Sequence, residues 1–377
     1  MPAILHTADV HLGRPWTGLA RCAARLSELH WECFEGLTRL ALERGVLALV
    51  IAGDLFDRPS PPAKLVERVR GAFRRLAAEG VAVVLAPGTH DGVSSSRSIY
   101  RTDALPSGVR VFLSARLGER LVVERGGAAA AFQGLAWDPQ GTPAAFIADY
   151  RRADDGLPEV LVLHGEVGSS KSRRSKDLPA TAEELASAGA SYVALGHRHA
   201  FLELRLGGRL WGAYPGSPFG LSFKEPELGA RSAALVTIEP GQEPRIELLP
   251  TTSVEWLRLA LDLGQFDSRE ELLAALAGSS GAERLALVEL SGAAGFPVAV
   301  EELEAEVGAR FLHLVAEDAS VQVSGRILER LVSEQSVRGV FARRMQARLA
   351  AAKSPGEHAE ASAAIREGLR ALAEDQG

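Results

Sequence analysis

Histidines and aspartates in this chain gather where apolar runs end. Six of the nine histidines lie at or just past such an end, and four aspartates accompany them. The set comprises His6, His11, His90, His164, His197, His199, Asp9, Asp54, Asp57 and Asp91. Both side-chain types bind divalent metals and move protons in catalysis, so the pattern indicates metal-assisted hydrolysis.

The spacing of these residues suits a metal site. Asp9 and His11 flank a single residue, as do His197 and His199, so on an extended segment both members of a pair can point the same way. Histidine and aspartate without cysteine suit manganese, iron or zinc. Asp54 stands alone at a strand end in "AGDLFD" and could bridge two ions, which about 3.5–4 Å apart can clamp a phosphate and activate water.

A simpler interpretation competes at each motif. A lone histidine at a strand end is usually a satisfied polar residue, and "GDLFD" alone is equally a turn capped by aspartate. Five apolar runs that all end in histidine or aspartate make a shared site the stronger hypothesis. The other three histidines, His30, His313 and His358, are interpreted as ordinary structural residues.

Alternating strands and helices would place these side chains close together. The runs "AILH", "VLALVIAGD", "VAVVLAPG", "VLVLHG" and "SYVALGH" predict buried strands, separated by helices from about residue 19, at 62–79 and at 181–189. This alternation predicts an α/β fold, in which ligands bind at the carboxyl ends of the strands. "RLWGAYPGS" and "SAALVTIEP" predict added antiparallel strands.

The pattern changes after "IELLPTTS" and suggests three domains. Residues 1–250 form the α/β part, 251–320 a small α+β unit of three strands and two helices, and 321–377 an amphipathic helical tail. Such a tail could bind a partner helix, or it could fold back on its own domain. Both interpretations stay open.

Composition limits the class of protein. The chain has 377 residues, 46% of them hydrophobic, and no apolar run of membrane-spanning length. No secretory signal is recognised in "MPAILHTADV", so a cytoplasmic protein without membrane association is expected. Cys22 and Cys33 fall on one face of a predicted helix, too far apart for a disulfide. The net charge of −6 counts slightly against nucleic-acid binding.

Five segments together resemble a known family. "HTADVHLG", "GDLFD", "PGTHD", "HGE" and "GHRH" have the order and spacing of the calcineurin-like metallophosphoesterases, and more narrowly of the SbcD-type DNA repair exonucleases and their YhaO-type relatives. "YPGSP" followed by "LSFKE" strengthens the narrower match, which covers residues 1–250. The resemblance implies a four-layer sandwich of two mixed β-sheets flanked by helices, followed by a cap domain and a helical tail.

The resemblance also implies roles for individual residues. One metal would be held by Asp9, His11, Asp54 and His199, and the second by Asp54, Thr89, His164 and His197. His90 would stabilise or protonate the leaving oxygen, oriented by Asp91 or Asp57. His6 would support the site without binding metal. The ions would be manganese, with iron or zinc as alternatives.

One residue departs from the family pattern. The family has asparagine in "GNHD", and this chain has Thr89. A threonine hydroxyl is shorter than an asparagine carbonyl and a poorer ligand, although it could reach a metal through water. We therefore expect a weaker second metal site rather than an absent one.

Three functions from different classes remain open. The first is a DNA repair nuclease that acts on double-stranded ends with an SMC-like ATPase bound by the C-terminal helices, and the family implies a homodimer. In that case the basic segment "KSRRSK", residues 171–176, could hold the DNA backbone, although such loops are usually only solvated. The second is a small-molecule phosphodiesterase. The third is a non-catalytic DNA-binding or scaffold subunit whose site has decayed at Thr89.

Overall fold

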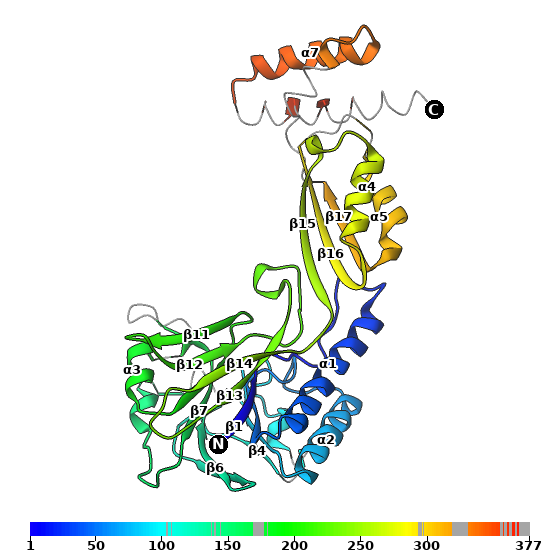
Figure 1. Cartoon of the computed structure of the whole chain (residues 1–377). Coiled ribbons are helices and arrows are strands. Elements are labelled where there is room, and N and C mark those ends of the chain that lie inside the picture. Colours follow the sequence, from blue (N-terminus) through cyan, green and yellow to red (C-terminus); the bar gives the residue numbers. More distant parts are fainter. Residues whose placement is uncertain are drawn as a thin grey trace. The chain divides into compact units, whose positions relative to one another are not determined.

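The computed structural model separates into two compact units, Met1–Val254 and Glu255–Gly377, which are described one at a time (Figure 1). The described residues are 1–102, 105–106, 108–136, 138, 141–143, 145–168, 177–178, 180–292, 296, 298–318, 331–354, 357, 360–361, 364–365 and 368. None of the described helices is long and apolar enough to cross a membrane.

The first unit contains two six-stranded mixed sheets, as predicted. In the first sheet β1 to β4 are parallel, and β13 and β14 add antiparallel strands beside β1. The strands in sheet order are β14 (Arg245–Pro250), β13 (Ser232–Thr237), β1 (Ala3–Thr7), β2 (Ala48–Ala52), β3 (Ala82–Ala86) and β4 (Val109–Val111).

The second sheet has a parallel centre and antiparallel edges. Its strands in order are β11 (Phe201–Leu206), β12 (Arg209–Pro215), β10 (Tyr192–Gly196), β7 (Glu159–His164), β6 (Ala128–Gly134) and β5 (Arg120–Arg125). The prediction that "RLWGAYPGS" is only an antiparallel addition was wrong. β12 pairs antiparallel with β11 but parallel with β10, because the chain reverses once between β10 and β11 and again in the β11–β12 hairpin.

Side chains of alternating strand positions build the layers. In β2, Leu49 and Ile51 face a core shared with helices α1 and α2, whereas Val50 faces a core between the two sheets. A third core lies on the other side of the second sheet and includes Leu185 of α3. The order helix, sheet, sheet, helix confirms the predicted four-layer sandwich (Figure 1).

The helices of this unit follow the predicted pattern. They are α1 (Ala23–Glu43), α2 (Ala63–Ala78) and α3 (Ala182–Ser187). α3 begins at a capping box in which Thr181 and Glu184 exchange hydrogen bonds, as their spacing predicted. Cys22 and Cys33 are buried and free, in agreement with the prediction.

Short elements complete the first unit. They are the strand pair β8 (Glu166–Val167) and β9 (Asp177–Leu178) and the 3₁₀ helices η1 (Ile99–Arg101), η2 (Phe146–Asp149) and η3 (Glu225–Glu227). η3 carries a residue of the candidate site described below.

The second unit contains a three-stranded parallel sheet in the predicted order of strand, helix, strand, helix, strand. Its elements are β15 (Glu255–Asp262), η4 (Leu263–Gln265), α4 (Arg269–Gly278), β16 (Gly281–Ser291), α5 (Val300–Val307), η5 (Gly308–Arg310), β17 (Phe311–Asp318) and α7 (Val337–Ala351). Leu272 of α4 and Leu303 of α5 pack with the sheet in one core. In the tail, Met345 of α7 packs with Leu331 and Ile365. The proposed boundary at residue 320 lies outside the described residues.

Candidate metal centre

The loops that follow β1 and β2 run side by side. The amides of Asp9 and His11 donate to the carbonyls of Gly53 and Asp54 at 3.1 and 2.9 Å, and Leu12 pairs with Phe56 as an isolated parallel bridge. The two loops thus continue the parallel sheet beyond its edge, which fixes the carboxylate and imidazole groups at adjacent positions.

Backbone strain is concentrated at this point. Among the described non-glycine residues, only Asp9, His11, Asp54 and His197 have positive φ, at 53°, 53°, 53° and 99°. Such conformations cost on the order of 1–3 kcal/mol each and persist where the surrounding structure enforces them. All four are residues of the predicted site, so the strain marks a functional centre.

Close packing in the centre requires glycine. A Cβ at Gly88 would lie 2.2 Å from Asp54 Oδ1, and one at Gly53 would lie 2.1 Å from His164 Nδ1. Gly53 also has a φ of +90°. These glycines let the turn after β3 and the end of β7 approach Asp54.

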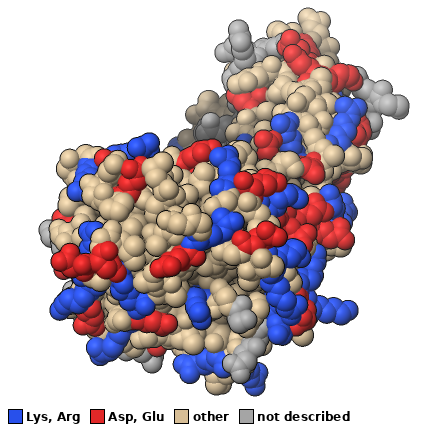
Figure 2. All heavy atoms as spheres, turned by 60° about the horizontal axis from the view of Figure 1, so that its bottom comes forward, with Lys and Arg blue, Asp and Glu red and all other residues tan. Residues whose placement is uncertain are grey.

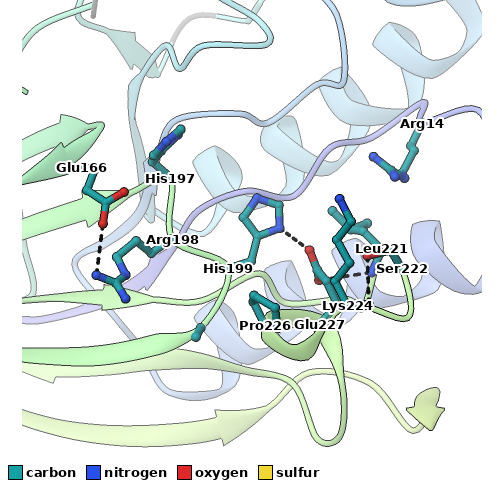
Figure 3. A pocket seen from close by; sticks show the side chains of 11 residues that line it. Arg14, Glu166, His197, Arg198, His199, Leu221, Ser222, Lys224, Pro226 and Glu227 are labelled. Carbon is teal, nitrogen blue, oxygen red and sulfur yellow. Dashed lines mark hydrogen bonds and ion pairs between the residues drawn. The ribbon is translucent and has the colours of Figure 1, made fainter. Parts of the chain in front are cut away.

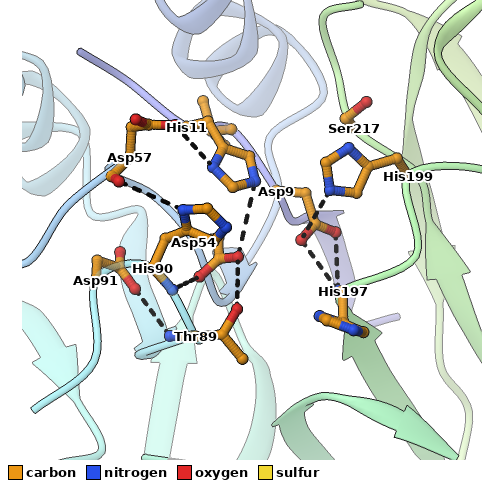
Figure 4. A network of polar contacts seen from close by, with 12 residues as sticks. Asp9, His11, Asp54, Asp57, Thr89, His90, Asp91, His197, His199 and Ser217 are labelled. Carbon is orange, nitrogen blue, oxygen red and sulfur yellow. Dashed lines mark hydrogen bonds and ion pairs between the residues drawn. The ribbon is translucent and has the colours of Figure 1, made fainter. Parts of the chain in front are cut away.

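The carboxylate of Asp54 lies at the middle of the cluster (Figure 4). Its Oδ2 atom is 3.4 Å from His164 Nε2 and 3.7 Å from His11 Nε2, and it accepts a 3.3 Å hydrogen bond from Thr89 Oγ1. Its Oδ1 atom accepts the amide of His90 at 2.8 Å. One oxygen of Asp54 therefore faces a histidine from each sheet.

Three groups of the described residues have ligand atoms within 4.8 Å of one another. The groups are Asp9–His11–His199, Asp9–Asp54–His164 and His11–Asp57–His90. The first two contain five of the seven predicted ligands, and the residue that they share is Asp9. His197 belongs to none of the three, but its ring centroid lies 5.3 Å from that of His164.

Buried ring nitrogens without hydrogen-bond partners test whether a metal fits. Nε2 of His164 and both ring nitrogens of His11 are buried and make no hydrogen bond among the described residues, although each has a carboxylate oxygen 3.4 to 3.7 Å away. Nδ1 of His164 faces the carbonyl of Ala52 at 2.9 Å, which leaves Nε2 free to bind an ion. Leaving these nitrogens unpaired costs free energy, so they fit divalent ions held by imidazole and carboxylate.

Electrostatics support the same interpretation. Burial opposes the charge on His164, but Asp54 outweighs it and raises the pKa of His164 to about 10. Burial would likewise raise the pKa of Asp54, but His164 and His11 lower it. Without a cation the Asp54 carboxylate therefore needs a protonated imidazole beside it, and an ion bound there would replace that proton.

The two histidines after β10 meet Asp9 in different ways. The amide of His197 donates to both oxygens of Asp9, at 3.0 and 2.9 Å. The ring of His199 places Nε2 3.9 Å from Asp9 Oδ1. Its other nitrogen, Nδ1, contacts Oε1 of Glu227.

Glu227 is a site residue that the sequence pattern did not reveal. It is buried in η3, whereas Glu225 at the other side of Pro226 is exposed. Burial opposes its charge, but the bond with His199 and the charge of Arg231 lower the pKa of Glu227. The nearby motifs "YPGSP" and "LSFKE" pointed to this segment of the chain. The sequence alone did not distinguish which of its two glutamates, Glu225 or Glu227, points inward.

Thr89 and His90 stand at the exposed side of the centre. The His90 ring lies edge-on to that of His11, with centroids 4.6 Å apart, and its Nδ1 faces the backbone carbonyl of Asp57 at 3.4 Å. The side chain of Asp57 contacts His11 instead, with Oδ1 3.4 Å from Nδ1, although its carboxylate also lies within 4.8 Å of the His90 ring. Asp57 thus meets His90 through its main chain.

Asp91 has a different position from the one that the resemblance implies. Its buried carboxylate accepts the amides of Gly88 and Phe56, at 2.8 and 3.1 Å, and the hydroxyl of Tyr100 at 2.5 Å. The described contacts of Asp91 do not include His90. Asp91 therefore holds the "PGTHD" turn against the "GDLFD" loop, and Tyr100 is a second supporting residue that no sequence motif indicated.

A pocket of about 420 Å³ opens beside His197 and His199 (Figure 3). Arg14, Arg198 and Lys224 contribute positive charge to its lining, and Arg198 pairs with Glu166 at 3.2 Å. Glu166 and Glu227 also line the pocket, so its charge is mixed. The basic segment 171–176 lies outside the described residues.

A comparison with protein-family models identifies the family to which this site belongs. The family model "Calcineurin-like phosphoesterase" matches residues 2–201, which include all seven predicted metal ligands. The chain belongs to the calcineurin-like phosphoesterase family. Within the family, the ends of β1, β2, β3, β7 and β10 supply the site of this chain.

Relatives of this phosphoesterase include named nuclease components. It is 28% identical to the uncharacterized metallophosphoesterase YhaO of Bacillus subtilis over 52% of this chain and 48% of that protein. It is 30% identical to the DNA double-strand break repair protein Mre11 of Aeropyrum pernix, over 70% of this chain and 64% of that protein. It is 28% identical to the SbcD component of the SbcCD nuclease of Escherichia coli, over 65% of this chain and 67% of that protein.

The chain thus spans from about half to two thirds of the length of these relatives. Membership of the family establishes the phosphoesterase fold and the metal-dependent class of the site.

Proposed function

We propose that this protein is a two-metal-dependent nuclease that hydrolyses phosphodiester bonds at the ends of double-stranded DNA. In this proposal manganese is the preferred ion, with iron or zinc as alternatives. The protein acts as a homodimer with an SMC-like ATPase, which the C-terminal helices around α7 bind.

The observation that carries the proposal is the position of Asp54. One carboxylate oxygen faces His11 from the first sheet at 3.7 Å and His164 from the second at 3.4 Å. Ligand distances of about 2.0–2.2 Å place the ligand atoms of one ion roughly 3–4 Å apart, so this oxygen can serve two ions at once. Asp9, His11 and His199 surround one position, and His164, His197 and Thr89 lie toward the other.

The residues of the chain then divide the work of hydrolysis. When bound, two divalent ions neutralise the phosphate and activate water for in-line attack. Asp54 would supply a ligand to both ions, and the strained turns hold the ligands before substrate arrives. His90 is exposed beside His11 and can give a proton to the leaving oxygen.

The names of the relatives support DNA as substrate. Two of the three are described as a DNA double-strand break repair protein and as part of a nuclease. Positive and negative side chains are intermixed on the face shown in Figure 2, so that face offers no uniform cationic track. In this proposal Arg14, Arg198 and Lys224, which line the pocket beside His199, contact the DNA backbone.

A small-molecule phosphodiesterase is the second candidate. The net charge of −6 and the limited size of the pocket beside His199 favour it. The same residues would perform the same chemistry on a nucleotide diester.

Manganese-dependent degradation of linear double-stranded DNA by the purified chain tests the proposal, with Asp54→Ala as control. Degradation that disappears in the control supports the nuclease. Turnover of a model diester without degradation of DNA, with or without an added ATPase partner, would favour the second candidate. A protein that binds no metal would make a non-catalytic subunit the better account.

A further inference from the structure

The segment between β12 and β13 encloses His199 in a buried polar network. Glu227 contacts Nδ1 of His199 through Oε1, and its Oε2 accepts Ser217 Oγ at 3.1 Å and the amide of Leu221 at 3.2 Å. Only 6% of Glu227 is exposed. A carboxylate buried so completely with three partners is held in one orientation.

Arg231 closes the network from the other side. Its guanidinium donates to the carbonyl of Ser217 at 3.0 Å, to Ser217 Oγ at 2.8 Å and to the carbonyl of His199. Arg231 thus fixes both the main chain of His199 and the serine that holds Glu227. Its positive charge also offsets the buried charge of Glu227.

These contacts of Glu227 and Arg231 fix the position of Nε2, the ring nitrogen of His199 that faces Asp9. With Nδ1 bound to Glu227, the proton of the neutral ring resides on Nδ1, and Nε2 presents a lone pair toward Asp9, 3.9 Å away. A carboxylate behind a histidine ligand both orients the ring and strengthens its basicity.

We propose that Glu227 is a positioning residue that tightens the metal position formed by Asp9, His11 and His199. The inference rests on the proposed metal site but not on DNA as substrate. It makes the two positions unequal, because His199 has a charged carboxylate behind it, whereas His164 has only the neutral carbonyl of Ala52.

Metal titration of the metal-free protein tests this proposal without an activity assay. Calorimetry and manganese electron paramagnetic resonance give the affinity and number of bound Mn²⁺ ions. Glu227→Ala should weaken the tighter Mn²⁺ site by about ten- to a hundredfold, and Glu227→Gln, which keeps the shape but not the charge, by less. The matched control is Glu225→Gln, an exposed glutamate of the same 3₁₀ helix, which should leave both sites unchanged.

The melting temperature separates positioning from a structural role. The Glu227 variants should lose part of the rise in melting temperature that Mn²⁺ produces, beyond any change in the metal-free protein. If they do not fold, Ser217→Ala removes one hydrogen bond to Glu227 and should give a smaller loss of affinity in the same direction. Wild-type Mn²⁺ affinity in the folded variants, or a wild-type chain that binds no Mn²⁺, would overturn the inference. DNA degradation by the wild type would leave the proposed nuclease standing in the first case.

Discussion

The Oδ2 oxygen of Asp54 lies 3.4 Å from the Nε2 nitrogen of His164, although the two residues end strands of different sheets. Both side chains are almost fully buried, and His164 Nε2 has no hydrogen-bond partner among the described contacts. The contact joins the two halves of the sandwich at one point. A cation between these groups would satisfy both.

Replacement of Asp54 should therefore disable both metal positions. We expect Asp54→Asn to lower turnover of a model diester by at least about a thousandfold, because the shared carboxylate is lost together with the charge that it provides. Bound manganese, measured on the same samples, should fall as well. Asp155→Asn, at an exposed aspartate paired with Arg120, is the control. Full metal content with full turnover in Asp54→Asn would exclude the bridging role.

Thr89→Asn should strengthen the second position. The Thr89 hydroxyl now donates to Asp54 at 3.3 Å, whereas an asparagine carbonyl is a neutral oxygen ligand with longer reach. We expect the affinity of the weaker Mn²⁺ site to rise on the order of tenfold, with a modest gain in turnover. Thr89→Val, which removes the hydroxyl at similar size, should have the opposite effect. A gain from almost no activity would instead indicate a decayed site.

His90→Gln should reduce turnover without loss of metal. The ring is exposed at the mouth of the centre, and the amides of Gly88 and His90 bind the turn to Asp91 and Asp54, so removal of the ring should cost about 10²–10⁴-fold through the missing proton donor. The loss should be larger for a diester with a poor leaving group than for a p-nitrophenyl diester, whose leaving group needs no proton. Equal losses on both substrates would argue against proton donation.

His30 should make the metal-free protein less stable in mild acid. Burial lowers the pKa of His30 to about 4, below its ordinary value of 6.5, while its ring stacks on Phe219 and contacts the carbonyl of Val10. Between these two pKa values His30 is protonated in the unfolded chain but neutral in the folded chain. The contribution of His30 to the free energy of unfolding therefore falls as pH falls. Between pH 7 and 5 this amounts to about 2 kcal/mol.

Urea unfolding of wild type and His30→Gln at both pH values measures this contribution. The variant is expected to be less stable at pH 7 but to lose about 2 kcal/mol less than the wild type on acidification. The same pH dependence in both proteins would show that His30 does not titrate in this way.

Neutralising the basic segment should weaken DNA binding. Replacement of Lys171, Arg173, Arg174 and Lys176 by glutamine removes charges that could each contact a phosphate, so the slope of log affinity against log salt should fall by up to about 0.9 per contact. Fluorescence anisotropy with a labelled duplex at several salt concentrations measures both effects. Unchanged affinity and slope would remove the segment from the DNA-binding surface.

Local sequence patterns were sufficient to define the strands and the residues at their ends. Apolar runs of five or six residues need burial on both faces, and this requirement alone predicts parallel central strands such as β2 and β7. Asp54 and His164 are conspicuous because each is a polar residue at the end of an apolar run: His164 is the last residue of β7, and Asp54 follows the end of β2. The α3 capping box and the strand and helix order of the second unit were likewise local patterns.

Which polar groups meet, and how, depends instead on long-range packing. The parallel pairing of β12 with β10 depends on a hairpin that reverses the chain, not on the composition of the strand. Asp91 faces Tyr100 and two amides rather than His90 because the turn folds over it. Glu227 reaches His199 across 28 residues, whereas Glu225 remains in solvent, because only packing distinguishes two chemically identical side chains.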